Sequence, residues 1–260
     1  MALILQLSDL HLFSSPTSLL RSVATHETLL QVVRHIQDSG LCPDHVVITG
    51  DHTHDELPES YAAVADLVRP WRDRLWQIPG NHDDRQLLRQ AFSDRIPPGS
   101  AEQPVTFSFE ADGWLCLGLD THLPGSVAGR IGAAQIDWAR RVVQRSDTAH
   151  VLLFLHHPPL RIGSIWMDAI GLEGREMLEI WCHEEPRIKL ICCGHVHHEF
   201  CARLGNAVVL STPSTGVQFS PRGDAPTFVP GAPGFRIIQL SETGFHSHVE
   251  RIGLLTVPTV

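Results

Sequence analysis

Side chains that bind metal ions gather directly after short apolar runs of this sequence. They are two aspartates, one asparagine and four histidines, in a chain of 260 residues with 17 histidines. This is too many donors for one tetrahedral ion, and it mixes oxygen with imidazole nitrogen. The set fits two adjacent divalent ions of the Mn, Fe or Zn type, and not Ca or Mg alone. The seven candidate ligands are Asp9, His11, Asp51, Asn81, His156, His195 and His197.

The spacing of these residues indicates how they converge. Asp9 and His11 are two positions apart, as are His195 and His197, and extended backbone would point both members of each pair the same way. Asp51 follows a glycine, which allows a sharp turn at the end of a strand. Its carboxylate has two oxygens, so this residue is the candidate to bridge two cations.

Five apolar runs of strand length precede the candidate ligands. Such runs are typical of strands buried on both faces. Ligands of α/β sheets bind outside the carboxyl ends of the strands, so these turns can meet at one edge. The runs are Leu3–Leu7, Val46–Thr49, Leu75–Pro79, Val151–Leu155 and Ile188–Cys193.

Helical patterns lie between the runs, and alternating strands and helices predict an α/β fold. Later strands lack helices between them, which favours mixed sheets, two of them face to face with helices outside. The expected helices are Thr28–Gln37, Glu59–Arg69, Ala133–Gln144 and Gly174–Cys182. The further expected strands are Thr106–Phe109 and Leu115–Leu119 as a hairpin, then Ala207–Ser211, Phe235–Leu240 and Phe245–Glu250.

Composition narrows the class of protein. Hydrophobic residues make up 43% and the formal net charge is −9, so the chain is neither disordered nor a good candidate for binding nucleic acid. We find no signal-peptide pattern and no apolar run of membrane-spanning length, which favours a cytoplasmic protein. The six cysteines form no CxxC pair and are expected to be reduced. We expect a single domain over 1–260, with a long loop at 210–235 that walls the site; the oligomeric state stays open, a homodimer included.

In order along the chain, the ligand-bearing blocks resemble those of the calcineurin-like metallophosphoesterases. The resemblance runs from residue 3 to about 200, and it implies a four-layer αββα sandwich around a binuclear metal site. The matching blocks are Asp9-x-His11, Gly50-Asp51, Gly80-Asn81-His82-Asp83, His156-His157-Pro158 and Gly194-His195-Val196-His197.

The resemblance also implies roles for these residues. One metal would take Asp9, His11, Asp51 and His197, and the second would take Asp51, Asn81, His156 and His195. His82 matches a histidine that lies near the phosphoryl group in the family. The predicted catalytic residues are therefore His82, Asp51 and Asn81. The implied reaction is attack of a metal-bridging hydroxide on phosphorus, with His82 stabilising developing charge or protonating the leaving alkoxide.

Within the family, the chain is similar to bacterial class III cyclic-nucleotide phosphodiesterases through Ser211–Phe219 and Pro233–Arg236. This favours a small anionic substrate such as cyclic AMP. A glycerophosphodiesterase is similar through the metal blocks, so another small phosphodiester is the alternative. A non-catalytic scaffold ranks lower, because every candidate ligand is kept. His52 departs from the family pattern, and it and His54 are expected beside the metals or at the substrate entrance.

Neighbouring residues have less specific interpretations. Asp83 and Asp84 are expected to cap a helix that starts near Arg85, or otherwise to orient a ligand histidine. His157 is expected to pack or to donate to backbone. For His122, a role in supporting the site and a role in packing alone are equally supported. The loop at 166–168 is expected either to wall the pocket or simply to pack.

Overall fold

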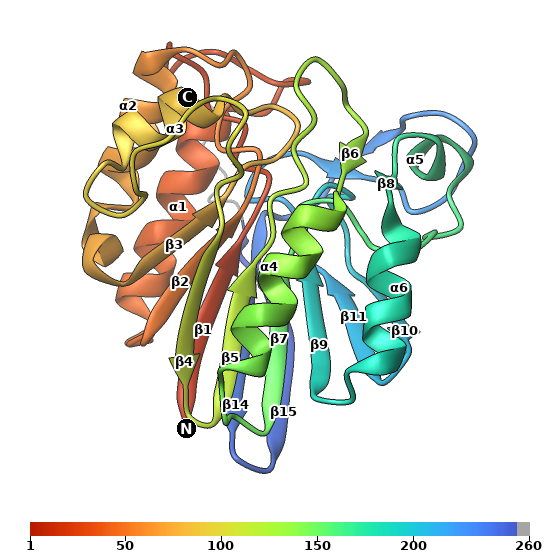
Figure 1. The fold of residues 1–260 in the computed structure, drawn as a ribbon. Coiled ribbons are helices and arrows are strands. Elements are labelled where there is room, and N and C mark those ends of the chain that lie inside the picture. Colours follow the sequence, from red (N-terminus) through yellow and green to blue (C-terminus); the bar gives the residue numbers. More distant parts are fainter. Residues whose placement is uncertain (254–260) are drawn as a thin grey trace.

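Two mixed β-sheets form the centre of the molecule, which we describe from a computed structural model over residues 1–253 (Figure 1). The predicted domain also included residues 254–260, which lie outside the described part. The first sheet has the order β15-β14-β1-β2-β3, and the second has the order β10-β11-β9-β7-β5-β4. In the first sheet, three parallel strands reach one edge and two strands paired antiparallel form the other, whereas the second sheet has parallel strands at its centre and an antiparallel strand at each edge.

The five predicted ligand-bearing strands all form, three in one sheet and two in the other. The first sheet contains β1 (Ala2–Leu7), β2 (His45–Thr49), β3 (Leu75–Ile78), β14 (Gly234–Ser241) and β15 (Gly244–Arg251). The second contains β4 (Phe107–Ala111), β5 (Trp114–Gly118), β7 (His150–Phe154), β9 (Ile188–Cys193), β10 (Phe200–Leu204) and β11 (Ala207–Ser211). Short pairs join β6 (Gly129–Arg130) to β8 (Leu172–Glu173), and β12 (Gln218–Phe219) to β13 (Phe228–Val229).

Helices cover the outer face of each sheet, as Figure 1 shows for α1 and α2 on one side and α4 and α6 on the other. Apolar residues at helical spacing bury the inner face of α1, where Leu29, Val32, Val33 and Ile36 pack on the first sheet. The helices are α1 (Thr25–Asp38), α2 (Pro58–Leu67), α3 (Arg85–Ala91), α4 (Ala133–Gln144), α5 (Ile165–Ala169) and α6 (Arg175–Glu184), with a 3₁₀ helix at Arg69–Arg74.

A third apolar layer lies between the two sheets and joins them. Ile4 and Val47 of the first sheet pack there with Trp114 and Phe154 of the second, all fully buried. The order of layers is therefore helices, sheet, sheet and helices, which is the predicted four-layer αββα sandwich. Among the described helices, none is long and apolar enough to cross a bilayer.

Two segments expected as loops contain regular structure. The segment 166–168 lies within α5, a helix of five residues. The predicted loop 210–235 contains the two-stranded ribbon β12–β13. Both elements are too short to show a hydrophobic period in the sequence.

Candidate metal centre

All seven predicted ligands lie together at the edge where the parallel strands of both sheets end. Asp9 and His11 follow β1, Asp51 follows β2 and Asn81 follows β3, all in the first sheet. The second sheet contributes the rest after β7 and β9, namely His156, His195 and His197. The packing of one sheet on the other therefore assembles the site, and neither sheet supplies a complete set of donors.

Left-handed backbone aims most of these side chains, so the expectation of extended backbone was wrong. Non-glycine residues adopt positive φ uncommonly, at a cost of about 1–2 kcal/mol each. The strands end before the ligands, so the segments that follow the strands carry the donors. The five ligands with positive φ are Asp9 (55°), His11 (48°), Asp51 (53°), His195 (69°) and His197 (52°).

Backbone hydrogen bonds hold these turns in place. The amide of Asp9 donates to the carbonyl of Gly50 at 3.0 Å, and the amide of His11 donates to the carbonyl of Asp51 at 3.0 Å. The Ser214 hydroxyl donates to the carbonyl of Asp9 at 2.6 Å. The amide of His195 donates to both carboxylate oxygens of Asp9, at 3.0 and 3.1 Å. Strain at the ligands is thus offset by contacts among four loops, those after β1, β2, β9 and β11.

The first group of donors is Asp9, His11, Asp51 and His197, whose candidate donor atoms lie within 4.8 Å of one another. His11 Nε2 is 3.2 Å from His197 Nε2 and 3.4 Å from Asp51 Oδ2. His197 donates its Nδ1 proton to the Val217 carbonyl at 2.8 Å, so a neutral His197 has its lone pair on Nε2. Lone pairs that face one another in a buried site are repulsive unless a proton or a metal cation lies between them. This donor set fits a divalent ion.

The second group is Asp51, Asn81, His156 and His195. Asn81 Oδ1 is 3.2 Å from His156 Nε2 and 3.0 Å from His195 Nδ1. His156 donates its Nδ1 proton to the Thr49 carbonyl at 2.7 Å, which leaves Nε2 for a ligand. Amide oxygen and neutral imidazole suit the same class of ion as the first group.

Asp51 belongs to both groups through a single oxygen. Its Oδ2 is 3.4 Å from Nε2 of His11 and 3.4 Å from Nε2 of His156. Its Oδ1 instead accepts the amide proton of His82 at 2.8 Å. One oxygen of Asp51 therefore faces both groups of donors and would be the one available to two cations, while the second anchors the loop that carries Asn81.

Electrostatics within the site keep the carboxylates ionised. Burial would raise the pKa of Asp9, but attraction to His197 lowers it to about 2. Burial also opposes ionisation of Asp51, yet His156 holds its pKa well below the usual range. Burial would lower the pKa of His156, and Asp51 overcomes this and raises it to about 9. Burial dominates at His195 and lowers its pKa to about 3. In the metal-free chain, a proton on His156 thus supplies positive charge beside Asp51.

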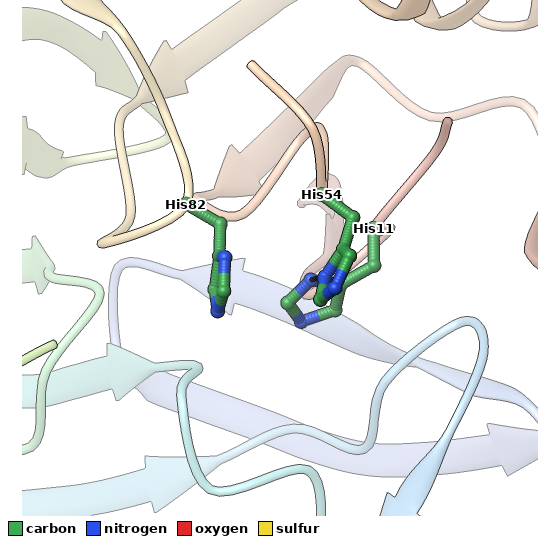
Figure 2. Close-up of side chains that lie close together, drawn as sticks. All are labelled: His11, His54 and His82. Atoms are coloured by element: carbon green, nitrogen blue, oxygen red, sulfur yellow. Dashed lines mark hydrogen bonds between the residues drawn. The ribbon is translucent and has the colours of Figure 1, made fainter. Parts of the chain in front are cut away.

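A cavity of about 420 Å³ opens onto both groups of donors. Its lining includes five of the seven donors together with His54 and His82, and Figure 2 shows that the side chains of His11, His54 and His82 point from neighbouring loops in the same direction. The rest of the lining is apolar and includes Trp166 of α5 and Phe219 of β12. The cavity can therefore hold a substrate with a charged group near the donors and an apolar substituent against the apolar lining.

Comparison with known proteins agrees with this geometry. A profile described as "Calcineurin-like phosphoesterase" matches residues 2–199. The chain belongs to the calcineurin-like phosphoesterase family. The prediction of an enzyme that hydrolyses phosphodiesters is thereby confirmed, as is the fold.

Relatives within the calcineurin-like phosphoesterase family cover most of the chain. A protein from Pseudomonas aeruginosa named 3′,5′-cyclic adenosine monophosphate phosphodiesterase CpdA is 33% identical, over 93% of this chain and 86% of its own length. A probable glycerophosphodiester phosphodiesterase, GpdQ, from Arcobacter nitrofigilis is 28% identical, over 98% of this chain and 95% of its own length. A solved purple acid phosphatase from yellow lupin shares the fold with a TM-score of 0.66 at 12% identity, covering 96% of this chain and 51% of that one.

His52 does not reach the site, contrary to expectation. Its side chain is fully buried, with Nδ1 3.0 Å from Asp83 Oδ2 and Nε2 3.0 Å from Gln77 Oε1. Asp83 also accepts from the Gly80 amide at 2.8 Å. Asp83 therefore stabilises the turn before Asn81. It neither caps a helix nor orients a ligand histidine.

The other neighbouring residues have structural roles. Asp84 caps α3 as predicted, because its Oδ1 accepts from the amides of Gln86 and Leu87 at 2.8 Å. His157 lies near His156 and His195, but both of its ring nitrogens are engaged, with Thr121 Oγ1 at 2.9 Å and the Val127 carbonyl at 3.2 Å. The prediction that it packs and contacts backbone is confirmed.

His122 supports the same turn as Asp83. Its Nδ1 is 2.9 Å from the Gly80 carbonyl, which favours a helper role in shaping the loop that carries Asn81. Sequence reasoning did not find Phe228, which lines the apolar side of the cavity from β13. The segment around it carries no motif or period that would single it out.

Gly50 allows a close approach between loops of the site, and we predict that Gly50→Ala destabilises the protein by about 3 kcal/mol. Its φ is +95°, and an added Cβ would lie 2.5 Å from His156 Nδ1 and 2.6 Å from the Gly80 amide nitrogen. Urea unfolding would measure the loss. Gly40→Ala is the matched control, since Gly40 has φ +75° with no atom within 4 Å. Equal losses of unfolding free energy in both variants would show that the close approach at Gly50 does not affect stability.

Metal stoichiometry tests the division into two groups. We expect the purified chain to bind two Mn²⁺ ions and Asn81→Ala to bind one tightly, because only the second group contains Asn81. Isothermal titration after chelator treatment measures this, with Asn206→Ala on the exposed turn before β11 as control. Two tight ions in the Asn81 variant would contradict the assignment.

Proposed function

We propose that this enzyme hydrolyses a 3′,5′-cyclic nucleotide such as cyclic AMP to the 5′-monophosphate. The observation that carries the proposal is the aromatic wall directly beside the candidate ligands. The ring centroid of Phe219 is 4.4 Å from that of His197, 5.2 Å from that of Trp166 and 4.8 Å from that of Phe228. A nucleobase is a flat, largely apolar group that stacks well on such a surface. The cyclic AMP phosphodiesterases among the relatives support the same substrate class.

The seven candidate ligands would hold two divalent cations, of the Mn, Fe or Zn type. When bound, such a pair supplies a hydroxide nucleophile near neutral pH and neutralises charge on the phosphoryl group. Asp51 holds the two groups of donors in fixed relation through Oδ2. Asn81 completes the second group with a neutral oxygen, which leaves less negative charge to repel an anionic substrate.

The overall reaction adds one water across a phosphodiester bond. The water oxygen joins phosphorus, the bond from phosphorus to O3′ breaks, and a proton ends on O3′. We propose that His82 donates this proton. It lines the cavity, and its backbone amide donates to Asp51 Oδ1, which holds the residue next to a candidate metal ligand.

A small acyclic diester such as a glycerophosphodiester is the second candidate. A separate hollow of about 290 Å³ adjoins the first and shares Asn81, His82 and Val127 with it. It is lined by polar groups that include Glu56 and Asp84. A diester with one apolar and one polar substituent could occupy both hollows, and the GpdQ relative supports this alternative.

Turnover of cyclic AMP with Mn²⁺ is the direct test. We expect conversion to 5′-AMP, seen by chromatography, with at least a hundredfold loss in Asn81→Ala and no loss in Asn206→Ala. Glycerophosphoethanolamine is the competing substrate. Faster cleavage of that diester would move the function to the second candidate, and inactivity on both and on bis(p-nitrophenyl) phosphate would contradict hydrolysis.

The role of His82 is tested by varying the leaving group. We expect His82→Ala to slow cyclic AMP hydrolysis by about 10²–10⁴-fold, because an alkoxide leaves poorly without a proton. The same variant should lose much less on bis(p-nitrophenyl) phosphate, since p-nitrophenolate needs no proton to leave. Comparison of kcat for both substrates measures the difference. Equal losses would show that His82 acts by stabilising charge and not as an acid.

A further inference from the structure

His54 joins a candidate metal ligand to the proposed acid. It follows β2 in the turn after Asp51, and its amide donates to the Leu12 carbonyl at 2.8 Å. Its ring Nδ1 is 3.4 Å from Nδ1 of His11, and its ring is stacked on His82 with centroids 4.9 Å apart and 23° between the planes. The half-buried ring lines the cavity, and Figure 2 shows that it points the same way as the rings of His11 and His82.

These three histidines are close enough to hold a third metal ion, but the contacts of His11 argue against it. Nε2 of His11 faces Asp51 and His197 in the first group of donors. A neutral imidazole that binds a cation through Nε2 keeps its proton on Nδ1. Nδ1 of His11 is then a donor toward His54 and has no lone pair for another ion.

The direction of this hydrogen bond determines the tautomer of His54. Nδ1 of His54 must accept the proton of His11, so a neutral His54 carries its own proton on Nε2. The acceptor keeps the ring of His11 oriented, as partners of metal-bound histidines commonly do. The Nε2 proton lies across the ring from His11, on a side chain that lines the cavity.

Stacking holds this donor beside His82. Phe13 packs on the ring of His54 with centroids 4.9 Å apart, while His82 lies at the same distance with nearly parallel planes. His54 is therefore held by an aromatic neighbour, an imidazole and a hydrogen bond. Two imidazoles side by side present N–H groups to a cavity whose remaining lining, apart from the candidate ligands, is apolar, and a phosphoryl oxygen is the acceptor that this pair suits.

We propose that His54 is a positioning residue for His11 and, through its Nε2 proton, a binding residue for the phosphoryl group beside His82. The proposal rests on the proposed phosphodiester chemistry, but not on cyclic AMP as the substrate. The proposal gives each ring nitrogen of His54 its own function. Nδ1 orients the metal ligand His11, and Nε2 binds the phosphoryl group of the substrate.

Two variants separate these functions. In His54→Asn, the side-chain oxygen can take the place of Nδ1 and accept from His11, but nothing replaces Nε2. In His54→Phe, both nitrogens are lost while the stack on His82 is kept. His150→Phe is the matched control, because His150 is a half-buried histidine at the start of β7, at the opposite end of that strand from His156.

Titration calorimetry supplies two readouts that need no turnover: affinity for Mn²⁺, and affinity of the Mn²⁺-loaded protein for inorganic phosphate. We expect His54→Phe to lose about 10–100-fold in Mn²⁺ affinity. We expect His54→Asn to keep Mn²⁺ affinity within about threefold and to lose about tenfold in phosphate affinity, the size of one charge-assisted hydrogen bond. His150→Phe should match the unmodified protein in both.

Each contrary result overturns a stated part of the proposal. Unchanged Mn²⁺ affinity in His54→Phe, or equal loss in the Asn and Phe variants, would show that Nδ1 does not position His11. Unchanged phosphate affinity in His54→Asn would show that Nε2 does not bind the phosphoryl group. If cyclic AMP is not hydrolysed but these affinities change as expected, the proposed substrate fails and the role of His54 stands.

Discussion

One oxygen atom, Oδ2 of Asp51, stands between nitrogen atoms of two histidines that reach it from different sheets. Its distances to His11 and His156 are equal at 3.4 Å. A buried carboxylate surrounded by imidazoles and an amide oxygen has too little positive charge around it, and its surroundings must supply a cation or a proton. In the metal-free chain, the raised pKa of His156 meets this need. Divalent ions would meet it better, because each can face several lone pairs at once.

This constraint explains the shape of the backbone around the site. Donors from separate loops reach common points only if the loops come unusually close, and three glycines allow this. A Cβ on Gly80 would lie 2.2 Å from Asp51 Oδ1, and one on Gly194 would lie 2.0 Å from Ser8 Oγ. The left-handed conformation of the neighbouring ligands is the other consequence of these short turns. The apolar layer between the sheets keeps the loops in register, since Ile4 and Val47 each lie in strands that lead to ligands.

Much of this arrangement could be predicted from the sequence, since strand length, apolar content and a following polar turn are local signals. The ligand-bearing strands and α4 formed close to their expected bounds. The strands β12 and β13 and the helix α5 could not be predicted, because elements of two to five residues leave no period. Backbone conformation at the ligands was also beyond reach, since a spacing of two residues is compatible with either extended or left-handed turns.

His52 and His54 show what local sequence patterns cannot predict. Both follow the same strand, two positions apart, and alternation would place them on one face. His52 instead turns inward to Asp83 and Gln77, whereas His54 pairs with the strand-end segment that carries His11. Their difference comes from partners distant in the chain, a carboxylate from the loop after β3 in one case and an imidazole from the loop after β1 in the other. The buried histidine secures the turn that presents Asn81, and the cavity-lining one contacts the other group of donors. Two residues of the same type, two positions apart, thus support opposite halves of the candidate site.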